Sequence, residues 1–122
     1  QVYGIEISEY AIKNCHPDVK GKILKGNAKS LPFADNYFDA VISLDTIHNL
    51  DRNDVLTALK EIERVTKDNN SFIKVDSYTT REEKEIFESW VLTAEYHDYP
   101  DEWLKTFKEA GYSGDYDWTI IK

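Results

Sequence analysis

The chain lacks methionine altogether and has a single cysteine, Cys15. One thiol cannot form an internal disulfide, which fits a reducing compartment, so we expect a cytoplasmic protein. Cys15 and His16 have no second pair of ligands at metal-binding spacing, and we therefore expect no metal site. The first residue is Gln1, and it opens directly onto a strand-like run. This start is typical of the interior of a longer gene product.

Long apolar runs are also absent, since none approaches the roughly 20 residues that a membrane-spanning helix needs. Positive charge is scarce: 15 Lys and Arg residues stand against 23 Asp and Glu residues, for a formal net charge of -8. An acidic surface repels phosphate backbones and anionic lipids. We therefore expect neither nucleic acid nor a membrane as a partner.

Strand-like and helix-like segments alternate along the 122 residues, which predicts one α/β domain over 1–122 with a mostly parallel sheet and flanking helices. The expected strands are 2–7, 22–26, 38–44, 71–76 and 115–121. Helices are expected over 8–15 and 52–66, from a capping box at Thr79 and Glu82 to 92, and from Pro100 to Gly111. The strand 38–44 is the most apolar, so we expect it to be central and buried on both faces.

Local signals predict where the helices begin and which faces they bury. Ser8 and Asp51 are expected to cap the first two helices, because their side chains can accept from free backbone N–H groups. Apolar residues at helical spacing predict two buried stripes. The stripes are Val55, Leu59, Ile62 and Val65 in one helix and Trp103, Phe107 and Ala110 in the other.

Polar groups follow several of the expected strands. In an open α/β sheet, ligands bind at the carboxyl ends of the strands. Glu6 ends the first strand, and residues 26–28, 44–48 and 76–78 follow three others. A carboxylate there can accept two hydrogen bonds from a ribose diol. By position alone, a solvent-facing glutamate is the commoner interpretation of Glu6.

Three runs resemble class I S-adenosylmethionine-dependent methyltransferases of the type 11 group, in the family's order and spacing. They are Val-Tyr-Gly-Ile-Glu-Ile-Ser (2–8), Gly-Asn-Ala-Lys-Ser-Leu-Pro-Phe-Ala-Asp-Asn-Tyr-Phe-Asp-Ala-Val-Ile-Ser (26–43) and Ile-His-Asn-Leu (47–50). Residues 107–112 also resemble the family's penultimate helix and its turn. The resemblance implies a Rossmann-like fold. It also implies methyl transfer from S-adenosyl-L-methionine to a small-molecule oxygen, nitrogen or carbon.

The resemblance implies cofactor-binding roles for five positions. Glu6 matches the acid that binds the ribose hydroxyls, and Ile7 matches the apolar residue that packs against adenine. Asn27 stands where the family usually has an aspartate that accepts from the adenine amino group, and an amide carbonyl can also accept. Ala28 matches the residue whose backbone N–H meets the adenine ring. Leu44 lies where the backbone approaches the methionine part of the cofactor.

Catalytic residues are harder to assign. His48, with Asp45 nearby, follows the same strand as Leu44, and its imidazole could deprotonate a hydroxyl or an amine. A histidine that only bonds the following loop is the commoner arrangement. Residues 31–33 are interpreted as loop packing. The segment 77–100 carries no recognisable motif and is expected to be either a substrate lid or an added helix packed through its aromatic side chains.

The sequence departs from the family at its start. The family's first strand and its Gly-x-Gly-type loop would precede Gln1, and the glycines present form no such motif. In the family, that strand lies between the strands that end here at Glu6 and Leu44, so both would have unpaired edges without it. We expect an upstream segment, a partner chain or a second copy in a homo-oligomer to supply the strand. The 122 residues alone are expected to be inactive.

Two other functions stay open at this point. A catalytically silent binding or regulatory module of the same fold, completed by a partner, would also fit the missing loop and Asn27. A nicotinamide-dependent oxidoreductase would also bind a ribose through Glu6, but it does not account for the run 26–43. A glycine-rich loop upstream of Gln1 would favour the enzyme.

Overall fold

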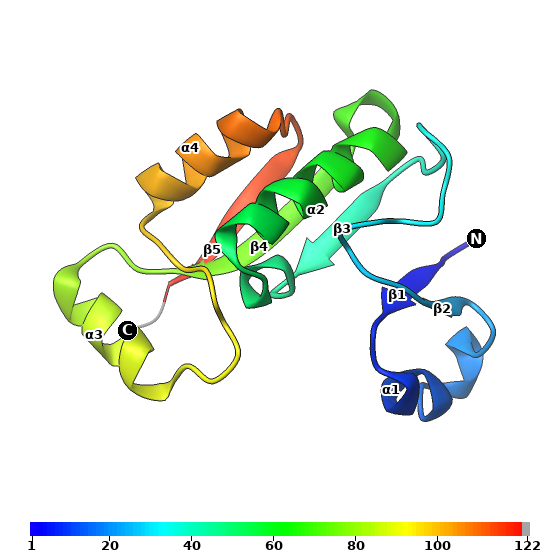
Figure 1. The fold of residues 1–122 in the computed structure, drawn as a ribbon, viewed down its shortest axis with the longest axis horizontal. Helices are drawn as coiled ribbons and strands as arrows, with labels where there is room; N and C mark the ends of the chain where they lie inside the picture. Colours follow the sequence, from blue (N-terminus) through cyan, green and yellow to red (C-terminus); the bar gives the residue numbers. More distant parts are fainter. Residues whose placement is uncertain (121–122) are drawn as a thin grey trace.

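The computed structural model describes residues 1–120. Five strands and four α-helices lie within them, in the predicted order (Figure 1). The strands are β1 (Gly4–Glu6), β2 (Ile23–Lys25), β3 (Val41–Leu44), β4 (Ser71–Ser77) and β5 (Asp115–Ile120). The helices are α1 (Glu9–Lys13), α2 (Arg52–Val65), α3 (Arg81–Trp90) and α4 (Pro100–Ala110). The predicted α/β class is confirmed, while the predicted end of the last strand at Ile121 lies outside the described residues.

The described strands form two separate parallel sheets. β1 pairs with β2, and β3, β4 and β5 pair in that order, all in parallel. Figure 1 shows the two sheets apart, with the β1–β2 pair beside the β3 edge of the larger sheet. The break in the sheet therefore lies between β1 and β3, the place where the resemblance puts the absent strand.

The core lies between the three-stranded sheet and the helices α2 and α4, which pack side by side on one of its faces (Figure 1). The sheet contributes Ile73 and Val75 of β4 to this core. Both predicted apolar stripes are buried, as expected: Val55, Leu59, Ile62 and Val65 on α2, and Trp103, Phe107 and Ala110 on α4. α2 also accepts backbone hydrogen bonds from Asn36 and Phe38, so it joins the sheet core to the segment that precedes β3.

Four of the predicted helix boundaries are confirmed. Ser8 and Asp51 accept hydrogen bonds from backbone N–H groups in the first turns of α1 and α2. Pro100 lies in the first turn of α4, where its missing N–H has no intrahelical partner to lose. Gly111 ends α4 with φ of 73°, a left-handed conformation that glycine adopts without steric cost.

The capping box of α3 lies one residue later than predicted. Thr80, not Thr79, is the N-cap residue and accepts from the N–H of Glu83. The Glu83 carboxylate accepts from the N–H of Thr79 in return. The prediction of Glu82 was wrong because two threonines and two glutamates stand side by side, so the same pattern occurs in two registers.

β3 is not the strand buried on both faces that its composition predicted. It pairs on one side with β4, and residues Ile42 and Leu44 are 70% and 51% exposed. Val41 packs against the core below α2, and side chains alternate along a strand, so Ile42 and Leu44 lie on the opposite face. The prediction failed because apolar composition indicates only that a strand is suited to burial. Whether the strand is buried depends on the segments that lie beside it.

We expect residues 1–122 expressed alone to associate, because an exposed apolar strand with an unpaired edge is a template for pairing between chains. The substitution Ile42→Lys should shift the population toward monomer in size-exclusion chromatography with light scattering. Ile86→Lys is the matched control, since Ile86 is an exposed isoleucine on α3, far from the edge. A wild-type chain that stays monomeric at high concentration would contradict this prediction.

Candidate functional site

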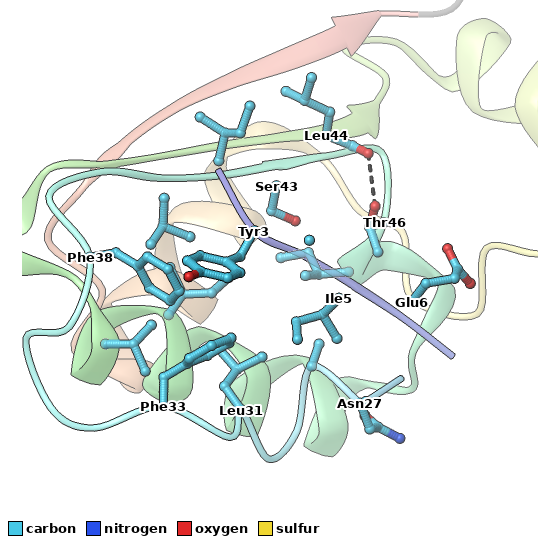
Figure 2. Close-up of a pocket in the computed structure, with 18 of the residues that line it drawn as sticks. Tyr3, Ile5, Glu6, Asn27, Leu31, Phe33, Phe38, Ser43, Leu44 and Thr46 are labelled. Atoms are coloured by element: carbon cyan, nitrogen blue, oxygen red, sulfur yellow. Dashed lines mark hydrogen bonds between the residues drawn. The ribbon is translucent and has the colours of Figure 1, made fainter. Parts of the chain in front are cut away.

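A groove of about 670 Å³ lies between β1 and β3. Its walls come from both sheets and from the connection between β2 and β3 (Figure 2). The two ends of the groove differ in chemistry. Glu6, Asn27 and Thr46 lie at one end, beside the carboxyl ends of the strands, and Tyr3, Phe33 and Phe38 lie at the other (Figure 2).

The aromatic end closes the groove where the strands begin. Phe33 and Phe38 pack edge to face with their ring centroids 4.6 Å apart. Tyr3, which precedes β1, lies 6.4 Å from each of them. Because Phe38 precedes β3, this cluster joins the two sheets through side chains where no backbone ladder of residues 1–120 joins them.

One long edge of the groove is the free side of β1. The N–H of Gly4 donates to Lys22 and the carbonyl of Glu6 accepts from Gly26, so these two residues of β1 face β2. In a parallel ladder, alternate residues face opposite sides. The N–H and C=O of Ile5 therefore point into the groove.

The opposite edge is the free side of β3. The N–H of Val41 donates to Asn70 and that of Asp45 donates to Lys74, so the odd-numbered residues face β4. The peptide groups of Ile42 and Leu44 consequently point toward β1. The Leu44 carbonyl accepts from the hydroxyl of Thr46 at 2.9 Å (Figure 2). Two strand edges thus face each other across the groove.

All five residues predicted to contact the cofactor line this groove: Glu6, Ile7, Asn27, Ala28 and Leu44. They come from three segments: the end of β1, the turn after β2 and the end of β3. The structure therefore brings together residues that the sequence separates. Thr46, Ser43 and Ile5 also line the groove and were not predicted. Strand alternation could have indicated Ile5, but nothing in the sequence marks Thr46 as the partner of Leu44.

Glu6 is arranged to accept further hydrogen bonds. Its Oε1 accepts from the backbone N–H groups of Ile7 at 3.0 Å and Ser8 at 3.1 Å. These two bonds orient the carboxylate at the end of β1 and involve only one of its oxygens. The second oxygen is oriented by the same contacts and suits a hydroxyl donor such as a ribose diol.

Asn27 lies in a turn at the rim of the groove. Its Oδ1 accepts from the N–H of Lys29 at 2.9 Å, and its main-chain carbonyl accepts from Ser30 at 3.0 Å. An amide oxygen has two lone pairs, so Oδ1 can take a second donor. The turn also places Ala28 against the groove and the core. Residues 31–33 were interpreted as loop packing; Phe33 packs against Phe38, and both Leu31 and Phe33 line the groove.

His48 lies behind β3, and it is not among the residues that line the groove. Its side chain is 7% exposed, its Nδ1 accepts from the N–H of Asp76 at 3.4 Å, and its Nε2 lies 3.9 Å from the Asp76 carboxylate. Its main-chain carbonyl accepts from the N–H groups of Glu95 and Tyr96. His48 therefore holds the segment before α4 against the end of β3.

Burial lowers the pKa of His48, and the charges of Asp76 and Asp45 oppose this effect only in part. Burial likewise raises the pKa of Asp76. Asp45 turns the chain away from β3 with φ of 52°, a left-handed conformation that aspartate tolerates better than most residues. The pair is therefore set for a neutral imidazole beside a carboxyl group.

The segment 77–100 contains a buried aromatic cluster. The Tyr78 hydroxyl lies 2.7 Å from Nδ1 of His97, and both rings pack against Phe87 of α3. Burial raises the pKa of Tyr78 strongly. Trp90 and Leu92, at the end of α3, are exposed. Tyr78 and His97 thus pack against α3, whereas Trp90 and Leu92 stay on the surface.

Within residues 1–120, no group of three His, Cys, Asp or Glu side chains is arranged to hold a metal ion. Cys15 is a free, half-buried thiol. No helix in this part of the chain is long and apolar enough to cross a membrane.

We expect the NMR titration of the His48 ring to have its midpoint below the ordinary histidine value of 6.5, because burial disfavours the imidazolium. The folded-state pKa is then lower than the unfolded one. The contribution of the neutral His48 ring to the stability of the folded state is therefore present above pH 6.5 and is lost as the pH falls through the folded pKa. The spectrum of His48→Gln identifies the resonance, and a midpoint at or above the ordinary value would contradict the burial argument.

Comparisons of this chain with known proteins all find methyltransferases. The model of the methyltransferase domain family matches residues 1–73. A demethylmenaquinone methyltransferase from Geobacillus kaustophilus is 41% identical over a match that covers 55% of this chain and 30% of that protein. The matched part is therefore less than a third of such curated relatives.

Solved structures match the fold over most of the chain. One is a Haloferax volcanii complex of the Trm112 methyltransferase activator with an inferred methyltransferase; its TM-score is 0.70 at 22% identity, over 89% of this chain and 49% of that chain. Another is a Thermotoga maritima SAM-dependent methyltransferase, a possible histamine N-methyltransferase, with a TM-score of 0.65 at 28% identity over 88% and 53%. The chain spans about half of each, and the predicted Rossmann-like fold is confirmed.

Proposed function

The chain belongs to the methyltransferase domain family, and on that premise we propose that the protein transfers a methyl group from S-adenosyl-L-methionine to a small-molecule oxygen, nitrogen or carbon. One observation carries the proposal. Glu6, Asn27 and Leu44 lie around one groove at the carboxyl ends of parallel strands, where ligands of open α/β sheets bind.

The residues present fit the adenosine part of the cofactor. Glu6 would accept from the ribose hydroxyls through its second carboxylate oxygen, and Ile7 would pack against adenine. Asn27 and Ala28 would meet the polar edge of the adenine, and the Leu44 backbone would lie beside the methionine part. When bound, the cofactor supplies an electrophilic methyl group on a sulfonium. The chain's contribution is binding and alignment.

For an acceptor that loses a proton, we propose His48 as the general base, with Asp45 as its charged neighbour. The lowered pKa keeps the ring neutral, which is the form that accepts a proton. The ring is buried and its carbonyl holds residues 95 and 96, so an acceptor reaches it only when the segment before α4 moves aside. In this proposal, that part of the segment 77–100 is a lid over the acceptor.

We also propose that a polypeptide strand lies between β1 and β3 in the working protein, supplied by an upstream segment or a partner chain. The peptide groups of Ile5, Ile42 and Leu44 that face the groove support it, since a parallel strand there would bond to both edges. The strand would occupy the apolar part of the groove and would end beside Glu6. The cofactor would occupy the polar end.

A catalytically silent module is the second candidate. Asn27 favours it, because an uncharged amide stands where the family has a carboxylate and its oxygen already accepts from Lys29. Such a module would bind the cofactor weakly or not at all, and its partner would carry the activity.

We expect Glu6→Ala in the full-length protein to weaken the binding of S-adenosyl-L-methionine in calorimetric titration by about tenfold or more, since a hydrogen bond to a charged group contributes roughly 1.5–3 kcal/mol. Glu9→Ala is the matched control, because Glu9 is exposed and pairs with Lys25. Unchanged affinity in Glu6→Ala would remove the ribose assignment. No binding by the wild-type protein would favour the silent module.

We expect the amide protons of Ile5, Ile42 and Leu44 to exchange slowly with solvent in the full-length protein or its complex, because an inserted strand would bond to these edges. Ile23 is the internal control, since it lies on the outer edge of β2. The measurement is residue-resolved hydrogen exchange. Exchange as fast at Ile5 and Ile42 as at Ile23 would contradict the inserted strand.

A further inference from the structure

We propose that Arg64 and Glu61 of α2 are positioning residues that set the spacing between the two halves of the cofactor groove. One half is the β1–β2 pair, which carries Glu6 and Asn27, and the other is the end of β3. This inference rests on the proposed function, because it assigns a role to the pair within that site.

The pair holds the connection between β2 and β3 by its backbone. The Arg64 guanidinium donates from Nη1 to the Phe33 carbonyl at 2.7 Å and from Nη2 to the Leu31 carbonyl at 3.0 Å. Glu61 accepts from the N–H of Leu31 at 2.7 Å. Both backbone groups of Leu31 are therefore bonded to two side chains that lie one helical turn apart on α2.

The two side chains also hold each other. Arg64 donates from Nε and Nη2 to the two carboxylate oxygens of Glu61, at 2.8 and 2.9 Å, and from Nη1 to Asp35 at 2.9 Å. This two-pronged geometry uses the planar fork of arginine, and a lysine ammonium cannot reproduce it. The Arg64 and Glu61 side chains are 32% and 19% exposed, so water competes only in part. The hydrogen bond from Arg64 lowers the pKa of Glu61, which keeps the pair charged at neutral pH.

The place of the Arg64–Glu61 pair in the fold gives it this role. Among residues 1–120, no backbone ladder joins β1 to β3, so the distance across the groove depends on other contacts. Leu31 and Phe33 line the groove and follow the Asn27 turn directly. The backbone bonds from Asn36 to Arg64 and from Phe38 to Val65 fix the next part of the same connection to α2.

An ion pair between α2 and the turn after β2 is weaker than the contacts of Arg64 and Glu61. Lys29 and Asp54 form an ion pair at 3.3 Å with both side chains more than a third exposed, and such pairs contribute little. The Arg64–Glu61 pair is thus the main side-chain link between α2, which is packed on β3 and β4, and the segment that leads back to β2.

The test compares two ligands in the full-length protein by calorimetric titration. S-adenosylhomocysteine spans both halves of the proposed site, whereas adenosine contacts only the β1–β2 half. We expect Arg64→Met to weaken the binding of S-adenosylhomocysteine by about tenfold or more, and the binding of adenosine by less. The reason is that the spacing between the two halves is no longer fixed once the charge-assisted hydrogen bonds of Arg64 are lost. Arg64→Lys should recover only part of the loss.

Arg52→Met is the matched control, because Arg52 lies on the same helix and pairs with Glu109 of α4, away from the groove. It should leave both affinities unchanged. If circular dichroism shows that Arg64→Met is not folded, Glu61→Gln is the test variant. Its amide oxygen can still accept from the N–H of Leu31, but the variant lacks the charged pair with Arg64.

Equal losses for the two ligands, or none, would overturn the positioning role. A wild-type protein that binds neither ligand would overturn the proposed function instead. A wild type that binds S-adenosylhomocysteine, together with a folded variant of unchanged affinity, would overturn this inference alone.

Discussion

The break in the backbone ladder between β1 and β3 is the constraint on which the rest of the structure depends. Parallel strands normally hold their spacing through shared peptide hydrogen bonds. Here the connection from β2 to β3 is bonded to α2 instead, through its own backbone and through Arg64 and Glu61. The Tyr3, Phe33 and Phe38 cluster packs at one end of the groove. α2 serves both sheets, because its apolar stripe packs on the larger one and its polar side holds the connection from the smaller one.

The same break gives the groove its two chemical ends. The strands run in parallel, so the groups that follow them gather at one end, where Glu6, Asn27 and Thr46 lie. The aromatic cluster forms where the strands begin. The polar and apolar side chains of the groove are therefore separated along the strand direction.

Local and alternating features of this fold could be predicted from the sequence. The Asp51 cap and the stripe from Val55 to Val65 depend on neighbours within a few turns, and the Rossmann-like class follows from alternation and from the family resemblance. The residues predicted to bind the cofactor lie around one groove because each ends or closely follows a strand. The exposure of Ile42 and the hydrogen bonds from Arg64 to Leu31 could not be predicted. The first depends on which strands lie beside β3, and the second join residues about thirty positions apart.

The facing edges have a thermodynamic consequence. A segment that enters between them would form two rows of backbone hydrogen bonds, at the entropic cost of ordering a single stretch of chain. Pairing with one edge alone would order the same stretch for half as many bonds, so occupancy would be all or none. A small molecule that touches both halves would favour the filled state. By reciprocity, the segment would raise the affinity for that molecule by the same factor. The interrupted sheet would then be a coupling device between chain assembly and ligand occupancy.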